Sequence, residues 1–443
     1  MQGISCNPGI SKRPDDWAAQ IRAGAYDPAF QKLYGAADVA AQRERYCRAL
    51  KEFGRLYGAE REVALFSAPG RTEIGGNHTD HNHGRVLAAS VNLDVIAVAA
   101  PSAENRIRIQ SEGYPEDAVE LDVLDPVKAE EGSSSALIRG MAGCFAQEGL
   151  AIGGLDAYTT SNVLKGSGLS SSAAFEVLVG TMLSHLFNQG GVDAVRIAQM
   201  AQQAENRYFG KPCGLMDQTA SSVGGIIAID FADPGKPEIL PVPFDFAATG
   251  YRLCIVDSGG NHADLTPEYA SIPEEMQAVA ASLGVRFLRE TSWQALLAAL
   301  PSLRREHGDR AVLRAMHFLK ENERVAGEVE ALKAGDFSRF LRLILESGHS
   351  SFEYLQNVYP ASHPDEQGLS LALCLAQSVL DGQGAWRVHG GGFAGTTQNF
   401  VPESLLAAFR RMIEAVFGPG SCHVLSIRPL GGVCLASLGQ DQG

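Results

Sequence analysis

Positive charge is in short supply in this sequence of 443 residues. Lysine and arginine together number 37 against 51 aspartates and glutamates, so the formal net charge is −14. Nucleic acids and anionic membranes are bound through basic patches, and this charge balance disfavours both as partners. A small anionic ligand is still compatible with it, because a local nest of backbone amides can hold one.

Long apolar runs and paired cysteines are missing as well. No run approaches the roughly 18 consecutive apolar residues of a membrane span, and the opening MQGISCNPGISKRPDD lacks the apolar core of a signal peptide. The eight cysteines form no CxxC pair and no zinc-ligand spacing. We therefore expect a reduced, cytoplasmic, soluble protein that is a monomer or a weak oligomer.

The length of the chain predicts two or three globular domains, at roughly 100–200 residues per domain. Apolar periodicity predicts a helix over 33–57, a β-rich region from there to about 130, and a mostly helical region over 271–350. Further strands are predicted at 62–69, 86–100, 105–113, 155–163, 224–231, 251–258, 423–429 and 432–438, and helices at 173–187 and 192–210.

This pattern divides the chain into a first half with a sheet and a helix-rich second half with its own strands. We expect two domains with a cleft between them. The predicted limits are a helical N-terminal extension at 1–60 packed on the first domain, an α+β domain at 61–210, and a second α+β domain at 211–443 whose last strands can return to the first.

Glycine, with 48 residues, is plentiful, and the strongest local signal is the glycine-serine segment KGSGLSSSA (165–173) between a predicted strand and a predicted helix. Glycines let successive N–H groups point inward, and the following helix adds the positive end of its dipole. Such a loop suits the phosphates of a nucleotide. It is not a Walker A motif, because no GK[ST] follows the glycines. A flexible turn that caps a helix is the alternative.

A second glycine segment, GGGFAG (390–395), formally contains the dinucleotide-binding pattern GxGxxG. That pattern requires a helix next, whereas the following TTQNFV indicates a strand. We therefore expect a tight turn that brings the backbone close to a ligand or to another loop.

The third segment, RTEIGGNHTDHNHG (71–84), crowds three histidines and an aspartate together. His78, His81 and His83 allow a zinc interpretation, but no predicted helix supports ligands one turn apart. Dense hydrogen-bond donors and acceptors also suit a hydroxyl-rich ligand such as a sugar. A solvated polar turn is the third interpretation.

The fourth segment, AENRYFGKPCGLMDQ (204–218), places Glu205 near the end of a helix and Asp217 after two apolar residues. A carboxylate in such surroundings is a candidate functional group, and an aspartate that caps a helix is the alternative.

Taken together, these four segments resemble the galactokinases of the GHMP small-molecule kinase superfamily. Residues 68–84 resemble the sugar-site signature, 166–173 the phosphate loop and 389–396 the third glycine motif, while 204–218 is similar to the segment with a metal-binding glutamate and the catalytic aspartate. The matches keep a consistent order over about residues 60–430. The resemblance implies an α+β, two-domain GHMP kinase-like fold with the active site in the inter-domain cleft.

It also implies that MgATP phosphorylates the anomeric (C1) hydroxyl of galactose. Asp217 would be the general base, with Arg71 beside it to keep the carboxylate ionised. Ser172 and Glu205 would ligate Mg²⁺. Sugar hydroxyls would contact Asn77, His78, Asp80, Gly214 and Tyr269. The ATP phosphates would lie on Gly166, Ser167, Gly168, Leu169, Ser170, Ser171, Ser172 and Ala173.

One departure from the family bears on the substrate. Most galactokinases read GEHTDY where this chain reads GNHTDH (76–81), so Asn77 replaces a glutamate that contacts the 6-hydroxyl of the sugar. Asn77 could still hydrogen-bond there, but losing the carboxylate would relieve repulsion against a 6-carboxylate, so a galacturonate kinase competes. A non-catalytic sugar and ATP sensor is the alternative from another class, and a zinc-dependent hydrolase is a third.

Overall fold

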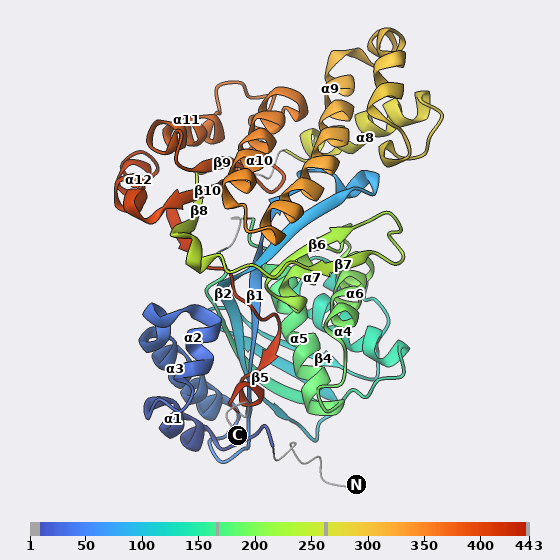
Figure 1. Cartoon of the computed structure of the whole chain (residues 1–443). Helices are drawn as coiled ribbons and strands as arrows, with labels where there is room; N and C mark the ends of the chain where they lie inside the picture. The colour runs from blue at the N-terminus through green and yellow to red at the C-terminus, as the bar shows by residue number, and fades with distance from the viewer. Residues whose placement is uncertain (1–8, 165–167, 261–264, 440–443) are drawn as a thin grey trace.

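The computed structural model describes residues 9–164, 168–260 and 265–439. Its described part holds an eight-stranded sheet in the first half and a four-stranded sheet in the second (Figure 1). The order of the first sheet is β12-β1-β2-β5-β3-β4, and β6 and β7 join it through β2. The α+β prediction is therefore confirmed.

Two long antiparallel strands form the spine of the first sheet. Their register pairs Ala64 with Ala99, and bulges interrupt it near Arg71 and Gly75. β3 and β5 pair in parallel, and β12 brings the end of the chain back beside β1. The strands are β1 (Ala64–Gly75), β2 (Arg85–Pro101), β3 (Arg106–Ser111), β4 (Glu116–Glu120), β5 (Leu155–Ser161), β6 (Ile226–Asp230), β7 (Glu238–Pro241) and β12 (Val433–Cys434).

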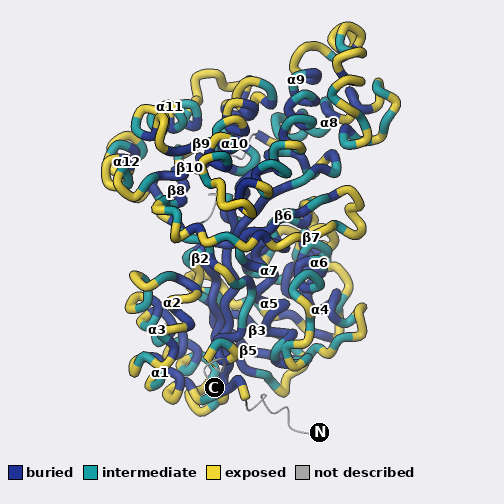
Figure 2. Tube along the Cα trace, in the orientation of Figure 1, coloured by how far each residue is buried: buried dark blue, intermediate teal, exposed yellow. Residues whose placement is uncertain are grey.

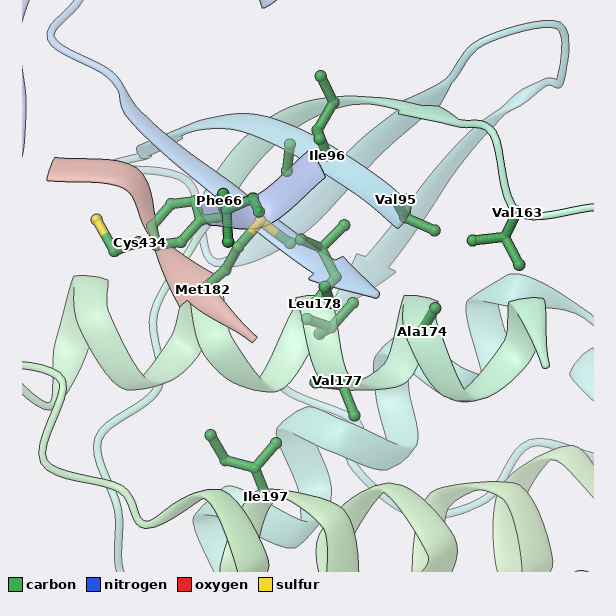
Figure 3. Close-up of a cluster of buried hydrophobic side chains, with 14 of the residues drawn as sticks. Phe66, Val95, Ile96, Val163, Ala174, Val177, Leu178, Met182, Ile197 and Cys434 are labelled. Atoms are coloured by element: carbon green, nitrogen blue, oxygen red, sulfur yellow. The ribbon is translucent and has the colours of Figure 1, made fainter. Parts of the chain in front are cut away.

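Helices cover this sheet, and one of them, α5, follows the glycine-serine segment and is mostly buried. Figure 3 shows side chains of this helix, among them Leu178 and Met182, packed beneath Phe66 of β1. Burying such side chains contributes about 1.5–3 kcal/mol each, so the helix start is firmly anchored. The covering elements are α4 (Ser134–Gln147), α5 (Ser171–Phe187), α6 (Ala194–Ala204), a π-helical turn (Glu205–Phe209) and α7 (Met216–Val223).

The N-terminal residues form three helices, α1 (Pro14–Arg22), α2 (Asp27–Tyr34) and α3 (Val39–Tyr57). The prediction of one helix from residue 33 is wrong at its start, because Gly35 adopts φ +88 and ends α2. These helices are tied to the sheet through buried Asp94, which accepts hydrogen bonds from Tyr34 Oη and Arg45 Nη1, both at 2.6 Å.

The second half combines its sheet, in the order β11-β8-β10-β9, with five longer helices. The strands are β8 (Tyr251–Asp257), β9 (Ala385–His389), β10 (Thr396–Pro402) and β11 (Cys422–Leu425). The helices are α8 (Thr266–Ser282), α9 (Trp293–Lys333, interrupted at Gly308), α10 (Phe337–Ser350, then a π-helical turn at Ser351–Leu355), α11 (Gly368–Leu380) and α12 (Glu403–Phe417).

The predicted strand at 432–438 needs a correction. Only Val433–Cys434 pairs with the sheet, and the next residues form the short helix α13 (Leu435–Leu438). Cys434 opposes Phe66, and the chain leaves the sheet edge after that pair. Alternation of small and apolar residues does not reveal where a strand loses its partner.

The site is positioned by β1 and β2, which run from the first half toward the second (Figure 1). β1 is buried along its whole length, whereas the outer ends of α8 and α9 are largely exposed (Figure 2). Within the described ranges, none of the helices combines the length and apolarity that crossing a lipid bilayer requires.

Candidate active site

A bidentate ion pair joins β1 to the start of α7. Arg71 Nε lies 2.6 Å from Asp217 Oδ1, and Arg71 Nη2 lies 2.5 Å from Oδ2. The Arg71 side chain is 10% exposed and that of Asp217 is 27% exposed, so the carboxylate keeps one open side. The structure therefore brings together two residues that lie 146 positions apart in the sequence.

The charge state of Asp217 follows from this pair. Burial raises the pKa of Asp217, but the Arg71 guanidinium, its hydrogen bonds and the Ser170 hydroxyl outweigh burial and hold the pKa below its usual value of 3.8. Asp217 is therefore an anion at neutral pH. An anionic carboxylate with an open side can accept a proton from a bound hydroxyl group.

The described part of the phosphate loop leads directly to this carboxylate. Ser170 adopts φ +55 immediately before α5, and its hydroxyl donates to Asp217 Oδ2. Arg71 Nη1 donates to the carbonyl of Gly168, and the backbone N–H of Arg71 donates to the Leu169 carbonyl at 3.0 Å. The sequence assigns Ser170 to phosphate binding alone, without its contact with Asp217.

The loop enters α5 at Ser171, so the N-terminal N–H groups of a buried helix lie where an anion would bind. Leu169 and Ala173 are fully buried anchors of this segment. The predicted phosphate-binding residues Gly166 and Ser167 lie outside the described residues.

The predicted metal ligands also lie together. Ser172 Oγ is 3.2 Å from Glu205 Oε1, and the Glu205 residue is 2% exposed. Gln218 Nε2 donates to the other carboxylate oxygen at 2.7 Å, and Lys211 Nζ lies 3.2 Å from Oε1. A hydroxyl and a carboxylate are the hard oxygen donors that Mg²⁺ prefers, so these residues fit that ion. Arg71, Ser170, Ser172, Glu205 and Asp217 are called the candidate reaction centre below.

The segment between β1 and β2, residues 76–84, forms a compact loop that we call the sugar loop. His78 adopts φ +56, and its Nε2–H donates to the Gly391 carbonyl at 2.9 Å. Burial, and then the nearby His81, lower the pKa of His78 to about 4, so the ring is neutral at pH 7. The Asp80 side chain is 28% exposed, and a Cβ on Gly214 would lie 2.9 Å from its Oδ2. A glycine at 214 therefore lets the backbone approach Asp80 closely.

Tyr269 of α8 reaches the third glycine motif. Its hydroxyl donates to the Gly392 carbonyl at 2.9 Å, and its ring lies edge-on to Phe393. The motif itself is the turn between β9 and β10, with a strand after it as expected from the sequence. No helix follows, so a dinucleotide-binding interpretation is excluded.

Asn77 lies in the sugar loop but is 0% exposed. Its amide nitrogen donates to Glu73 Oε1 at 3.2 Å and to the Gly390 carbonyl at 2.6 Å. Its amide oxygen accepts from Asn357 Nδ2 at 2.8 Å and from Ser351 Oγ at 3.3 Å. Protein groups thus use both hydrogens and both lone pairs of the amide. A direct contact between Asn77 and a sugar stays a prediction.

The zinc interpretation gains nothing from the three-dimensional arrangement. Among the described residues, no group of three or more His, Cys, Asp or Glu side chains gathers closely enough to hold a metal ion. The His83 ring instead stacks on Phe287 at 3.6 Å between centroids.

Two cavities adjoin the predicted site residues. One of about 410 Å³ is lined by Asp80, His81 and Gly214. One of about 560 Å³ is lined in part by Ser171 and Ser172. A cavity of about 920 Å³ beside the 241–247 connector includes none of the predicted residues.

The sequence did not point to the other walls of the cavity beside the phosphate loop. They include Glu112, Tyr114, Asp117, Thr159, Phe175 and Phe209. These residues come from β4, β5, α5, the turn after β3 and the π-helical turn. Predicting that they line one cavity would have required the order of the strands in the sheet, which the sequence patterns did not provide.

Two family models match the chain in agreement with this geometry. Residues 132–225 match the GHMP kinases N terminal domain, and residues 51–101 match the galactokinase galactose-binding signature. With the mixed fold and the phosphate loop before α5, these matches place the protein among the GHMP small-molecule kinases.

Relatives narrow the class further. The chain is 34% identical to a galactokinase of Streptomyces coelicolor over 83% of this chain and 92% of that protein, and 31% identical to one of Actinobacillus pleuropneumoniae over 82% and 92%. The chain belongs to the galactokinase family.

Solved structures agree with this assignment. A galactokinase of Lactococcus lactis, solved in complex with galactose, matches with a TM-score of 0.72 and 26% identity over 86% of this chain and 98% of that one. A mevalonate kinase of Methanococcus jannaschii matches with a TM-score of 0.60 at 12% identity over 82% and 98%, and so shows the fold alone.

Proposed function

We propose that this protein transfers the γ-phosphoryl group of ATP to the anomeric (C1) hydroxyl of galactose, giving galactose 1-phosphate and ADP. The observation that carries the proposal is the Asp217 carboxylate, which pairs with Arg71, accepts a hydrogen bond from Ser170 of the phosphate loop and is 27% exposed. Membership of the galactokinase family supports it, as does the likeness to a galactokinase solved with galactose.

Asp217 is the general base in this proposal. Its carboxylate accepts the proton of the sugar hydroxyl as the oxygen attacks the phosphorus. Arg71 keeps the carboxylate ionised in the meantime, and its guanidinium offsets negative charge on the transferring group. Phosphoryl transfer depends mainly on such positioning and charge stabilisation, so few groups are needed.

The nucleotide would lie in the cavity of about 560 Å³, with its phosphates on residues 166–173 at the start of α5. Ser172 and Glu205 would hold Mg²⁺, which when bound neutralises charge on the phosphates. The sugar would contact His78, Asp80, Gly214 and Tyr269. We also propose that the protein is cytoplasmic and that its domains have the limits given above, 1–60, 61–210 and 211–443.

The test is the release of ADP with a panel of sugars and MgATP, for wild type and Asp217→Asn. We expect turnover of galactose by wild type and almost none by the variant. Turnover of galacturonate without galactose would replace the proposed substrate. ADP release at equal rates by both proteins would remove Asp217 as the base, and sugar binding without ADP release would indicate a sensor.

A further inference from the structure

Glu73 and Asn77 form a buried pair of one carboxylate and one amide at the start of the sugar loop. Asn77 Nδ2 donates to Glu73 Oε1 at 3.2 Å, and Glu73 and Asn77 are 6% and 0% exposed. Most galactokinases have a glutamate where this chain has Asn77. In this chain the nearby negative charge lies four residues earlier, on Glu73 of β1.

A buried arginine balances that charge. Arg387 of β9 is 0% exposed, and its Nη2 donates to Glu73 Oε1 at 2.7 Å. Its Nη1 donates to the carbonyl of Ile74, the next residue of β1. Arg387 therefore holds both the side chain of Glu73 and the backbone that leads into the sugar loop.

The loop backbone at position 77 is held from α9. Glu321 Oε1 accepts from the backbone N–H groups of Gly76 and Asn77 at 3.2 and 3.4 Å, and His317 Nε2 donates to the Asn77 carbonyl at 2.9 Å. Both side chains are fully buried. Glu73, Asn77, His317, Glu321 and Arg387 are called the loop-support cluster.

We propose that Glu73 and Asn77 act as one exchangeable carboxylate–amide pair that positions the sugar loop, so that Asn77 is a positioning residue and not the determinant of selection between neutral and acidic sugars. The sugar readout of this proposal rests on the proposed function. Glu73 then supplies the carboxylate that most galactokinases have at position 77, and the preferred substrate remains a neutral sugar.

The physical reason is the cost of mismatching two buried groups. A carboxylate at position 77 would lie about one hydrogen-bond length from the Glu73 carboxylate, while Arg387 donates to Glu73 and to the Ile74 carbonyl. Uncompensated buried charge is strongly destabilising. It would also remove the donor that serves the Gly390 carbonyl. An amide at position 73 would restore a donor toward position 77.

A shift of this pair would be felt at the sugar. Asn77 is bonded to Gly390, and the adjacent His78 is bonded to the adjacent Gly391. The sugar loop and the third glycine motif are therefore held together by two neighbouring bonds. Moving the first bond displaces His78, whereas the Arg71–Asp217 pair is held separately by Ser170 and by the Gly168 carbonyl.

The experiment is a double-mutant cycle with near-isosteric changes: Glu73→Gln, Asn77→Asp and the double variant. We expect each single change to raise the KM of the sugar about 10-fold while kcat stays within about 3-fold, and the double variant to return the KM to within about 3-fold of wild type. Recovery is incomplete because the Gly390 carbonyl still faces a carboxylate. Glu414→Gln, at the exposed Arg410–Glu414 pair, is the matched control and should leave KM unchanged.

Unfolding midpoints give a second readout that needs no substrate. The double variant should unfold at a higher temperature than Asn77→Asp, and folding of the double variant where Asn77→Asp alone does not fold also supports the pair. A double variant no better than the sum of the single changes, in KM or in midpoint, overturns the proposal. So does Asn77→Asp with unchanged KM, or an Asn77→Asp variant that loses a wild-type turnover of galacturonate while it keeps the turnover of galactose.

Failure of the proposed function shows itself separately. If wild type phosphorylates no galactose, the proposed function fails, and the same cycle is read from the KM of the sugar that the panel identifies and from the unfolding midpoints.

Discussion

The candidate reaction centre and the loop-support cluster each include a residue of β1, Arg71 and Glu73, and these two residues are two positions apart. The two sets differ in whether their charged side chains are open to a ligand or already bonded within the protein. Asp217 keeps 27% of its side chain exposed. Glu321 and Arg387 are 0% exposed and satisfy backbone groups. Ionisable residues near a site are thus not all candidates for chemistry.

The difference extends to the pKa values. Arg71 holds the pKa of Asp217 below its usual value against burial, and the carboxylate remains open to a ligand. Burial works against Glu321 too, but Arg324 and the other cations around it lower its pKa to about 2. In the proposed function Asp217 receives a proton from the substrate, whereas Glu321 accepts hydrogen bonds from the loop backbone.

The largest effect is expected at Asp217. Asp217→Asn should lower kcat about 10³-fold, as expected for loss of a general base, with little change in the unfolding midpoint. ADP release and thermal unfolding of the same preparation measure both. A large loss of stability with modest loss of kcat would mean that Asp217 belongs with the structural residues.

At Arg387 the expected effect is on folding. Arg387→Met leaves Glu73 buried without its cation and should lower the free energy of unfolding by about 3 kcal/mol or more, measured by urea unfolding. Arg410→Met, at a surface pair, should lower the free energy of unfolding far less, because solvent screens such a pair. Equal costs at the two sites would remove the distinction between a buried support and a surface pair.

A pH dependence is expected at Arg71. Asp217 acts only when ionised, so wild-type kcat/KM should persist until the pH falls to the depressed pKa of this group. Arg71→Met should lower kcat about 10²-fold and move the acid limb of the profile to higher pH. Arg71→Lys keeps the charge and should leave that limb nearer to wild type. An acid limb that does not move in Arg71→Met would contradict the coupling.

The smallest effect is expected at Gly214. A Cβ there would lie 2.9 Å from Asp80 Oδ2, so Gly214→Ala should raise the KM of the sugar about 10-fold with kcat nearly unchanged. Gly54→Ala in α3 is the control, since its Cβ would meet nothing closer than 3.5 Å. Identical kinetics for the two variants would indicate that Asp80 does not contact the bound sugar.

Short-range patterns predicted much of the site. The phosphate loop lies between β5 and α5 as expected, and the GGGFAG turn leads into a strand. The contact of Ser170 with Asp217 and the bond of Asn77 with Asn357, 280 residues away, were not predictable, because side-chain pairing is decided by tertiary packing.

Helix α4 was also missed, for a different reason. Ala136 to Phe145 are buried on every face, so no apolar stripe marks the helix in the sequence. The prediction of a helix over 33–57 was wrong only at its start, because Gly35 ends α2 and α3 begins at Val39.

The most direct test is the identity of the product formed from galactose and MgATP, read by ³¹P NMR with proton coupling. We expect a phosphomonoester whose phosphorus couples to the anomeric proton, formed by wild type and not by Asp217→Asn. Phosphate attached at another carbon of galactose would contradict the assignment. So would the absence of any galactose phosphate when the same protein phosphorylates another sugar of the panel.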